Sequence, residues 1–191
     1  IIIFITLLLP LAIVWLIGGS GEGQSPIESG TVSVYVSEED CVKDMDINEY
    51  LKCVVAAEMP ADFEEEALKA QSVAARTYLY SHIAEKDKGN IAERHNGAVI
   101  CTDSTHCQAY ISEDKRRESW GAGADENWNK ISTAVDETTG QIMTYNDEII
   151  SAVFHSTSSG MTESAVDVWG ADVPYLQSVA STGDEESPKY H

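Results

Sequence analysis

The pattern of apolar and polar positions along the chain separates an apolar start from a mixed body. Residues 1–19, IIIFITLLLPLAIVWLIGG, carry no charged side chain, and about 20 such residues suffice for a helix that spans a bilayer. A cleaved signal peptide usually has a shorter apolar core and a small-residue cleavage site, and Leu16-Ile17 is a poor one. We therefore expect a retained transmembrane anchor, with a signal peptide as the alternative.

The residues after this apolar run predict a linker followed by one domain. Residues 20–30 are rich in Gly and Ser, which is typical of a flexible connection. Nothing basic follows the apolar run for some distance, and basic residues usually mark the cytoplasmic side of a membrane helix. We therefore expect residues 31–191 to form a single extracytoplasmic domain attached to the cell membrane by one helix.

The body mixes strand and helix periodicities, which favours the α+β class with a small antiparallel sheet. The two-residue period of TVSVYV predicts a strand over residues 31–36. The helical period that follows predicts a helix capped by Asp46, with Glu49 at the capping-box position, and stopped by Pro60. Further predicted elements are helices over about residues 62–85 and 127–137, a loop over 88–105 and a hairpin over 141–155 around Asn146-Asp147.

Glu58 stands out because it lies on the apolar stripe of the first predicted helix, in the last turn before Pro60. Apolar surroundings and the negative end of a helix dipole both disfavour a carboxylate anion, so we expect the pKa of Glu58 to be raised. A raised pKa is what a general acid near neutral pH needs. The alternative is a structural ion pair between Glu58 and a basic residue of the next helix.

The charge balance limits the partners of the body. The formal net charge is −20, from 32 acidic and 12 basic residues, so nucleic acid is an unsuitable partner. An anionic polymer would also be repelled at long range, so we expect a polymeric substrate to be neutral or bound in a local basic groove. Lys69 and Arg76, seven residues apart on one face of the second predicted helix, are candidates to bind substrate or Glu58. The alternative for Lys69 is an exposed pair with Glu65.

Two histidines and two cysteines lie close together in the predicted loop. His95, Cys101, His106 and Cys107 follow the spacing H-x5-C-x4-H-C, and two nitrogens with two sulfurs complete a tetrahedral Zn²⁺ site. A site filled by four protein ligands is structural and not catalytic. The alternative is a pair of disulfides, one of them Cys101–Cys107, because four cysteines outside the membrane usually pair.

The segment FHSTSSGMTES, residues 154–164, places a dense set of hydroxyls after the last predicted strand. Loops at strand ends often carry sites, and His155 is suited to act there as a base or hydrogen-bond donor. The expected sugar contacts are the hydroxyls of Ser156, Ser158 and Thr162 and the aromatic rings of Trp169 and Tyr175. The alternative is an ordinary polar loop. No G-x-S-x-G elbow is present, which disfavours serine nucleophile chemistry.

Four blocks of the sequence resemble the stage II sporulation protein D (SpoIID) family. They are EYLKCVVAAEMP, EEALKAQSVAARTY, DSTHCQAY and FHSTSSGMTESAVDVWGADVPYLQSV, in this order, over residues 31–179. The resemblance implies a membrane-anchored lytic transglycosylase that cuts the MurNAc–GlcNAc bond of peptide-free peptidoglycan strands during forespore engulfment. It assigns the general acid/base to Glu58 and substrate contacts to Lys69, Arg76 and His155, and it favours structural zinc at the His/Cys set.

The same resemblance implies partners, and the chain differs from the family pattern in two places. The implied partners are an amidase similar to SpoIIP, which removes stem peptides, and a membrane scaffold similar to SpoIIM. Cys53 stands where the family usually has a small residue, so a Cys41–Cys53 disulfide is conceivable. The chain also ends soon after PYLQSV, so we expect part of the domain to be missing. The rival functions are a non-catalytic, wall-binding amidase activator and a hydrolase whose products carry reducing ends.

Overall fold

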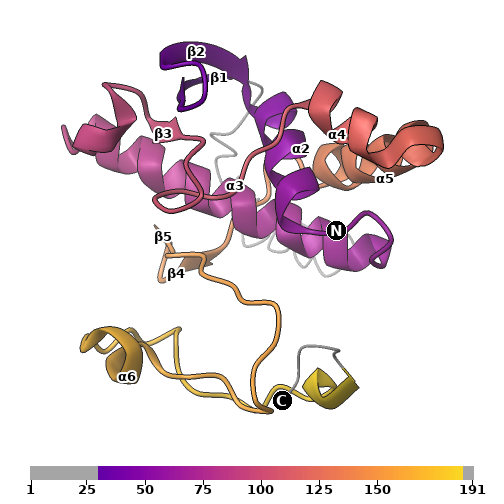
Figure 1. Ribbon diagram of the computed structural model, residues 1–191. Coiled ribbons are helices and arrows are strands. Elements are labelled where there is room, and N and C mark those ends of the chain that lie inside the picture. The colour runs from indigo at the N-terminus through magenta and orange to yellow at the C-terminus, as the bar shows by residue number, and fades with distance from the viewer. Residues whose placement is uncertain (1–29, 187–191) are drawn as a thin grey trace, which may run out of the picture.

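The computed structural model describes residues 30–186 and shows a small sheet and a group of helices, followed by an extended C-terminal segment (Figure 1). The strands are β1 (Thr31–Val36), β2 (Cys41–Asp46), β3 (Ile100–Cys101), β4 (Thr144–Tyr145) and β5 (Glu148–Ile149). The α-helices are α2 (Ile47–Glu58), α3 (Glu65–Asp87), α4 (Glu113–Trp120), α5 (Ala124–Glu137) and α6 (Ala165–Trp169). Three short 3₁₀ turns are η1 (Glu93–His95), η2 (Gly121–Gly123) and η3 (Asp184–Glu186). The predicted α+β class is confirmed.

The main sheet is mixed, whereas the sequence predicted an antiparallel one. Its order is β2-β1-β3, with β1 antiparallel to β2 and parallel to β3. The alternation in β1 buries Val32, Val34 and Val36, as a half-buried strand requires. β3 lies within the segment predicted as a loop. It was not predicted because a strand of two residues is too short to show a periodic pattern. β2, which begins at Cys41, was likewise missed.

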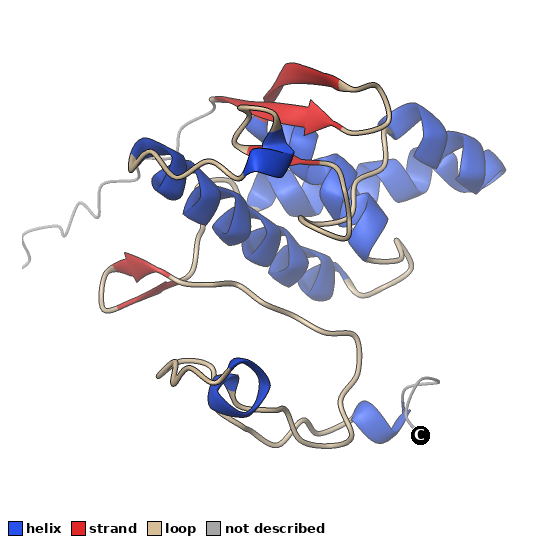
Figure 2. Ribbon diagram, turned by 60° about the vertical axis from the view of Figure 1, so that its left-hand side comes forward, coloured by secondary structure: helices blue, strands red, loops and turns tan. Residues whose placement is uncertain are grey.

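Three helices enclose the core beneath the sheet (Figure 2). Helix α2 packs on both α3 and α5, and α3 packs on α5. The Asp46 side chain accepts hydrogen bonds from the N–H groups of Asn48 and Glu49 and thereby caps α2 as predicted. The fully buried members of the core include Leu51, Val54, Val55, Leu68, Leu79, Ile131 and Val135.

The helix boundaries follow the prediction to within a few residues, with two helices missed, α4 and the five-residue α6. Helix α3 begins at Glu65 and not near Asp62, and α5 begins at Ala124 and not at Asn127. Such shifts at helix ends are common. Helix α4 was not predicted, because EDKRRESW has almost no apolar residues and none of its side chains is buried.

The predicted hairpin exists but is short. Asn146 and Asp147 both have positive φ, 52° and 65°, as a type I′ turn between antiparallel strands requires. Beyond β5 the chain runs apart from the helices in both views (Figures 1 and 2). Residues 150–186 contain only α6, η3 and a bridge between Met161 and Ala180. The C-terminal segment is therefore held mainly by its own contacts.

The predicted anchor and most of the linker lie outside the described residues. Among residues 30–186, no helix combines the length and the apolar character needed to cross a bilayer. The expected membrane attachment by residues 1–19 thus stays a prediction.

Candidate active site and metal centre

Glu58 is the last residue of α2, as the sequence predicted. Met59, with an extended backbone, ends the helix and donates its N–H to Val55 O. The Glu58 side chain is half-buried, and its Oε1 accepts a hydrogen bond of 2.7 Å from the N–H of Ala109. In the described part of the chain no salt bridge involves Glu58. A main-chain donor, and not a basic side chain of the next helix, therefore orients this carboxylate.

Arg116 is a cation near Glu58 that the sequence did not single out. From α4, its guanidinium donates a hydrogen bond to Ala56 O in the last turn of α2 and lies 5.0 Å from the centre of the Trp120 ring. The carbonyls of a last helical turn lack intrahelical donors and carry partial negative charge. Arg116 thus compensates the end of the helix that carries Glu58. Arg116 was missed in the sequence because it lies on α4, and α4 shows no periodic pattern of apolar residues that would predict a helix.

Lys69 does not face Glu58 but pairs with three glutamates. Its Nζ lies 2.8 Å from Glu65, 3.1 Å from Glu66 and 2.7 Å from Glu137. Hydrogen bonds to Glu137 and Glu65 raise the pKa of Lys69. The pair with Glu65 that the sequence offered as the alternative is therefore present, and the ammonium is already neutralised.

Arg76 is 1% exposed and binds the C-terminal end of α5. Its guanidinium donates to Thr138 O at 2.6 Å, to Val135 O at 2.9 Å and, at 3.4 Å, to Asn48 in the first turn of α2. Ten residues separate Asn48 from Glu58, and a helix rises 1.5 Å per residue, so about 15 Å separates the two ends. Its contacts therefore give Arg76 a structural role, and neither Lys69 nor Arg76 is brought to Glu58.

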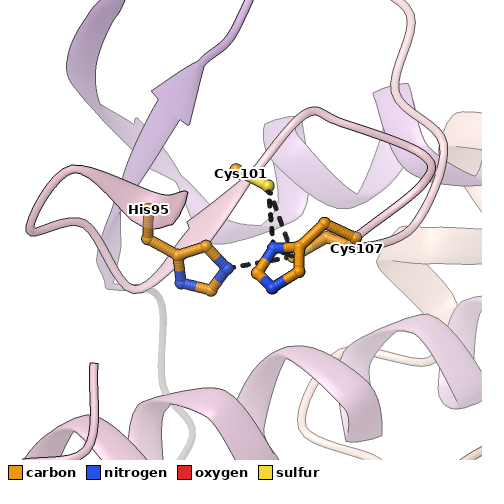
Figure 3. Close-up of side chains that lie close together, drawn as sticks. His95, Cys101 and Cys107 are labelled. Carbon is orange, nitrogen blue, oxygen red and sulfur yellow. Dashed lines mark hydrogen bonds between the residues drawn. The ribbon is translucent and has the colours of Figure 1, made fainter. Parts of the chain in front are cut away.

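The four predicted metal ligands converge (Figure 3). His95 comes from η1 and Cys101 from β3, and His106 and Cys107 follow a turn at Asp103. The Cys107 sulfur lies 3.2 Å from His95 Nε2 and 3.7 Å from His106 Nδ1, and the Cys101 sulfur lies 3.5 Å from both His106 Nδ1 and the Cys107 sulfur. All four donor atoms lie within 4.8 Å of one another.

The four separations of 3.2–3.7 Å fit a tetrahedral zinc ion. Zinc–sulfur bonds of about 2.3 Å and zinc–nitrogen bonds of about 2.0–2.1 Å place neighbouring ligand atoms about 3.3–3.8 Å apart. The Cys101 and Cys107 sulfurs, 3.5 Å apart, are too distant for a disulfide bond of about 2.05 Å. The donor set and its spacing therefore suit a structural metal better than the alternative disulfide.

Cys41 and Cys53 are also free thiols, so the conceivable disulfide between them is not formed. The Cys41 sulfur contacts the Glu39 carboxylate at 3.9 Å. Cys53 is buried in α2, and burial raises the pKa of its thiol to about 11. Cys53 therefore behaves as a small core residue.

The C-terminal segment forms an apolar groove of about 550 Å³. Of the predicted sugar contacts, the groove is lined by His155, Ser158, Thr162, Trp169 and Tyr175. The Trp169 side chain is 59% exposed there, which leaves its face available. Ser156 is exposed but does not line the groove. All lining residues fall within 153–179, so the groove and Glu58 are separate surfaces.

Polar contacts inside the C-terminal segment already occupy some of these hydroxyls. The Ser158 hydroxyl and N–H both donate to Asp184, the second at 2.8 Å. The Thr162 hydroxyl accepts from Val179 N–H at 2.9 Å. The Tyr175 hydroxyl accepts from Ser151 N–H at 3.0 Å. Asp184 was missed because the acidic tail showed no pattern that marks a contact with this loop.

A half-buried carboxylate at a helix end and a His/Cys cluster that could hold a metal ion are the features of a candidate acid–base enzyme with a candidate metal centre. Residues 35–145, more than half of the chain, match the family model described as stage II sporulation protein, SpoIID. The chain therefore belongs to the stage II sporulation protein D family, as the sequence blocks indicated.

Three relatives extend this match. Stage II sporulation protein D of Bacillus amyloliquefaciens is 40% identical over 167 residues, 87% of this chain and 46% of the relative. The Bacillus subtilis (strain 168) protein of the same name is 38% identical over 173 residues, 90% of this chain and 49% of the relative. The amidase enhancer of B. subtilis is 36% identical over 136 residues, 71% of this chain and 16% of the relative. The chain spans about half the length of the two sporulation relatives.

Proposed function

We propose that this protein is a peptidoglycan lytic transglycosylase of sporulation that cleaves the MurNAc–GlcNAc bond of peptide-free glycan strands. Glu58 is its general acid and then its general base. Family membership supports the sporulation role. The observation that carries the chemistry is the Glu58 carboxyl group, fixed through Oε1 by the Ala109 N–H. In the described residues this is its one hydrogen bond, so Oε2 is left for the substrate.

The reaction needs one carboxyl group. Protonated Glu58 donates its proton to the glycosidic oxygen as the bond from that oxygen to MurNAc C1 breaks. The sugar's own C6 hydroxyl attacks the developing oxocarbenium ion at C1, and the Glu58 carboxylate accepts the hydroxyl proton. The product is a 1,6-anhydro end, no water is consumed, and Glu58 returns to its protonated form. Ordinary glycosidases differ because they use a pair of carboxyl groups.

The C-terminal groove is the proposed binding surface for the glycan strand. Aromatic rings suit stacking against sugar rings, and the exposed face of Trp169 with Tyr175 provides them beside His155. The hydroxyls of Ser158 and Thr162 already form hydrogen bonds with Asp184 and with the Val179 N–H, so they bind sugar only through their remaining donor or acceptor capacity. Lys69 and Arg76 are left out of this proposed surface because glutamates and carbonyls already occupy their donors.

The remaining parts of the proposal concern attachment and assembly. Zinc held by His95, Cys101, His106 and Cys107 supplies a structural crosslink and no chemistry of the reaction. Residues 1–19 anchor the protein in the cell membrane with the catalytic part outside. The proposed partners are an amidase that removes stem peptides and a membrane scaffold, because the reaction calls for strands without peptides.

An alternative function is favoured by one observation, the match to an amidase enhancer. In that case the protein would bind the wall and activate an amidase without cutting glycan. The test is to incubate the purified protein with peptide-free glycan strands and to identify products by mass spectrometry. Anhydro ends support the proposal and reducing ends indicate a hydrolase. Intact glycan, with stimulation of an added amidase, supports the enhancer.

The role of Glu58 has its own test. General acid–base catalysis typically contributes about 10²–10⁴-fold, so Glu58→Gln is expected to lower kcat by at least about 10²-fold while glycan binding stays measurable. Glu49→Gln is the matched control, since Glu49 lies on the same helix and only pairs with Lys52 at the surface. Near-normal turnover by Glu58→Gln would refute the assignment of Glu58 as the general acid.

A further inference from the structure

Two residues join the candidate metal centre to Glu58. The Cys107 sulfur belongs to the His/Cys cluster, and the N–H of Ala109 is the donor to Glu58 Oε1. Consecutive Cα atoms are 3.8 Å apart, so the two positions are at most about 7 Å apart along the chain. A displacement of Cys107 is therefore passed directly to the group that orients the carboxylate.

The segment between the cluster and Glu58 packs against the core through Tyr110 and Ile111, but few main-chain hydrogen bonds hold it in the described structure. On the upstream side, Asp103 O accepts the N–H groups of His106 and Cys107 at 3.0 and 2.8 Å. On the downstream side, Ile111 N–H reaches Cys53 O at 3.4 Å, a long hydrogen bond. Gln108 is only 6% exposed, yet neither polar atom of its amide has a partner in the described structure. The Gln108 side chain therefore does not fix this segment.

A metal in the cluster would attach the segment to two other elements. Cys101 lies in β3, which pairs with the central strand β1, and His95 is a buried residue of η1. A metal bound to all four ligands would tie residues 106 and 107 to these two elements at once. Without the metal, residues 106 and 107 keep the hydrogen bonds of the Asp103 turn, the contact of Cys107 with Tyr78 and the packing of Cys107 against the core, but lose the direct link to β3 and η1.

We propose that the metal in the His/Cys cluster positions Glu58, through Cys107 and the main-chain N–H of Ala109. The metal takes no part in the reaction itself. It affects the position of the Glu58 carboxylate because Cys107 and Ala109 are only two residues apart. This inference rests on the proposed zinc site and extends the proposed role of Glu58. It implies that the cluster and the carboxylate are energetically coupled.

Coupling between two sites is reciprocal for binding free energies. If the metal favours the Ala109–Glu58 hydrogen bond, that bond must favour metal binding by the same factor. A hydrogen bond of ordinary net strength predicts that Glu58→Ala lowers zinc affinity by about 3- to 10-fold. Glu58→Gln retains an acceptor oxygen and should keep most of the affinity. Glu49→Ala, which alters only a surface pair on the same helix, should leave affinity unchanged.

The experiment measures zinc affinity by competition with a chromogenic chelator for the purified chain and these three variants. In parallel, the Ala109 amide signal is followed by NMR while zinc is removed and restored. The expected result is the affinity order above, with the Ala109 signal moving on zinc removal and the signals of α5 staying in place. Equal zinc affinity of Glu58→Ala and the unaltered chain, or an Ala109 signal indifferent to zinc, would overturn the inference.

A catalytic readout separates this inference from the proposed function. Cys101→Ser removes a ligand distant in sequence from Ala109, and Cys41→Ser is its matched control outside the cluster. A misplaced catalytic group can cost about 10²-fold in rate, so Cys101→Ser should lower kcat by about 10- to 100-fold with a smaller change in KM. Absence of anhydro products from every form would refute the proposed function alone, because the affinity and NMR results do not depend on turnover.

Discussion

Replacing Arg76 by methionine tests whether this buried cation supports the fold or binds substrate. The sequence favoured substrate binding, whereas the guanidinium contacts the carbonyls of Thr138 and Val135 at the end of α5. Burial lowers the pKa of Arg76, which reflects the cost of holding a charge away from water. Arg76→Met keeps most of the side-chain volume and removes the charge and its donors.

The expected loss of stability follows from these contacts. Both carbonyls keep a second donor, Gln141 N–H for Thr138 O at 3.0 Å and the Thr138 hydroxyl for Val135 O at 3.1 Å, so the loss is that of two hydrogen bonds to a charged group, about 1.5–3 kcal/mol each. Removal of the buried charge returns part of its desolvation cost. We therefore expect Arg76→Met to lower the free energy of unfolding by about 2–4 kcal/mol. Lys69→Met is the control on the same helix, and its exposed ion pairs predict little change.

Urea unfolding followed by circular dichroism measures the effect. For an m-value of about 1–3 kcal/mol/M, a loss of about 2–4 kcal/mol shifts the midpoint by about 0.7–4 M. Glycan binding should be normal for the folded fraction, because the structure gives Arg76 no exposed donor. A variant as stable as the original chain, with weakened glycan binding, would refute the reasoning and restore Arg76 to the substrate site.

Three further measurements test other parts of the structure. Metal analysis should give one zinc per chain, and peptide mapping that recovers a Cys101–Cys107 disulfide would contradict this. Hydrogen bonds from Ser158 hold the pKa of Asp184 below its usual range, so their contact should be present above the unfolded-state pKa of about 3.9 and be lost as pH falls below it. The Ser158 amide signal should report this, and Asp184→Asn should abolish the pH response. Tyr50→Phe removes a buried hydroxyl that has no hydrogen-bond partner in the described residues. The free energy of unfolding should therefore stay constant or rise by up to about 1 kcal/mol. A decrease in the free energy of unfolding would contradict this and show that the hydroxyl is hydrogen-bonded.

Local chemistry explains why some features were predictable. Asp46 and Pro60 bound α2 by capping and by the missing N–H of proline, and both effects act within one turn. The His/Cys cluster was predictable because its donor atoms lie within thirteen residues, so few conformations keep them apart. Asn146-Asp147 likewise specifies its own turn through positive φ. In each case the determining interaction is short-range in the sequence.

The missed features depend on main-chain groups or on distant contacts. Ala109 orients Glu58 through an N–H that almost any residue would supply, so no side-chain pattern reveals it. The carbonyls that bind Arg76 belong to residues about sixty positions later and look alike in every sequence. Lys69 showed the opposite case, since its partner Glu65 lies one helical turn away and was anticipated as the alternative. The contacts of Arg76 and Glu58 were therefore missed because they involve main-chain groups, whereas the contact of Lys69 was foreseen because it joins two side chains on one helix.

The separation of Glu58 from the C-terminal groove bears on what kind of substrate fits. No residue before 153 lines the groove, so a ligand confined to it does not touch the Glu58 carboxylate. Contacts made equally in the ground state and the transition state strengthen binding without raising kcat. A polymer held along the groove would gain such uniform binding, while in the proposed function the bond to be cut lies at Glu58. Two distinct surfaces are therefore reasonable for an enzyme of long glycan strands, whereas an enzyme of a small sugar would need its binding contacts around the carboxylate itself.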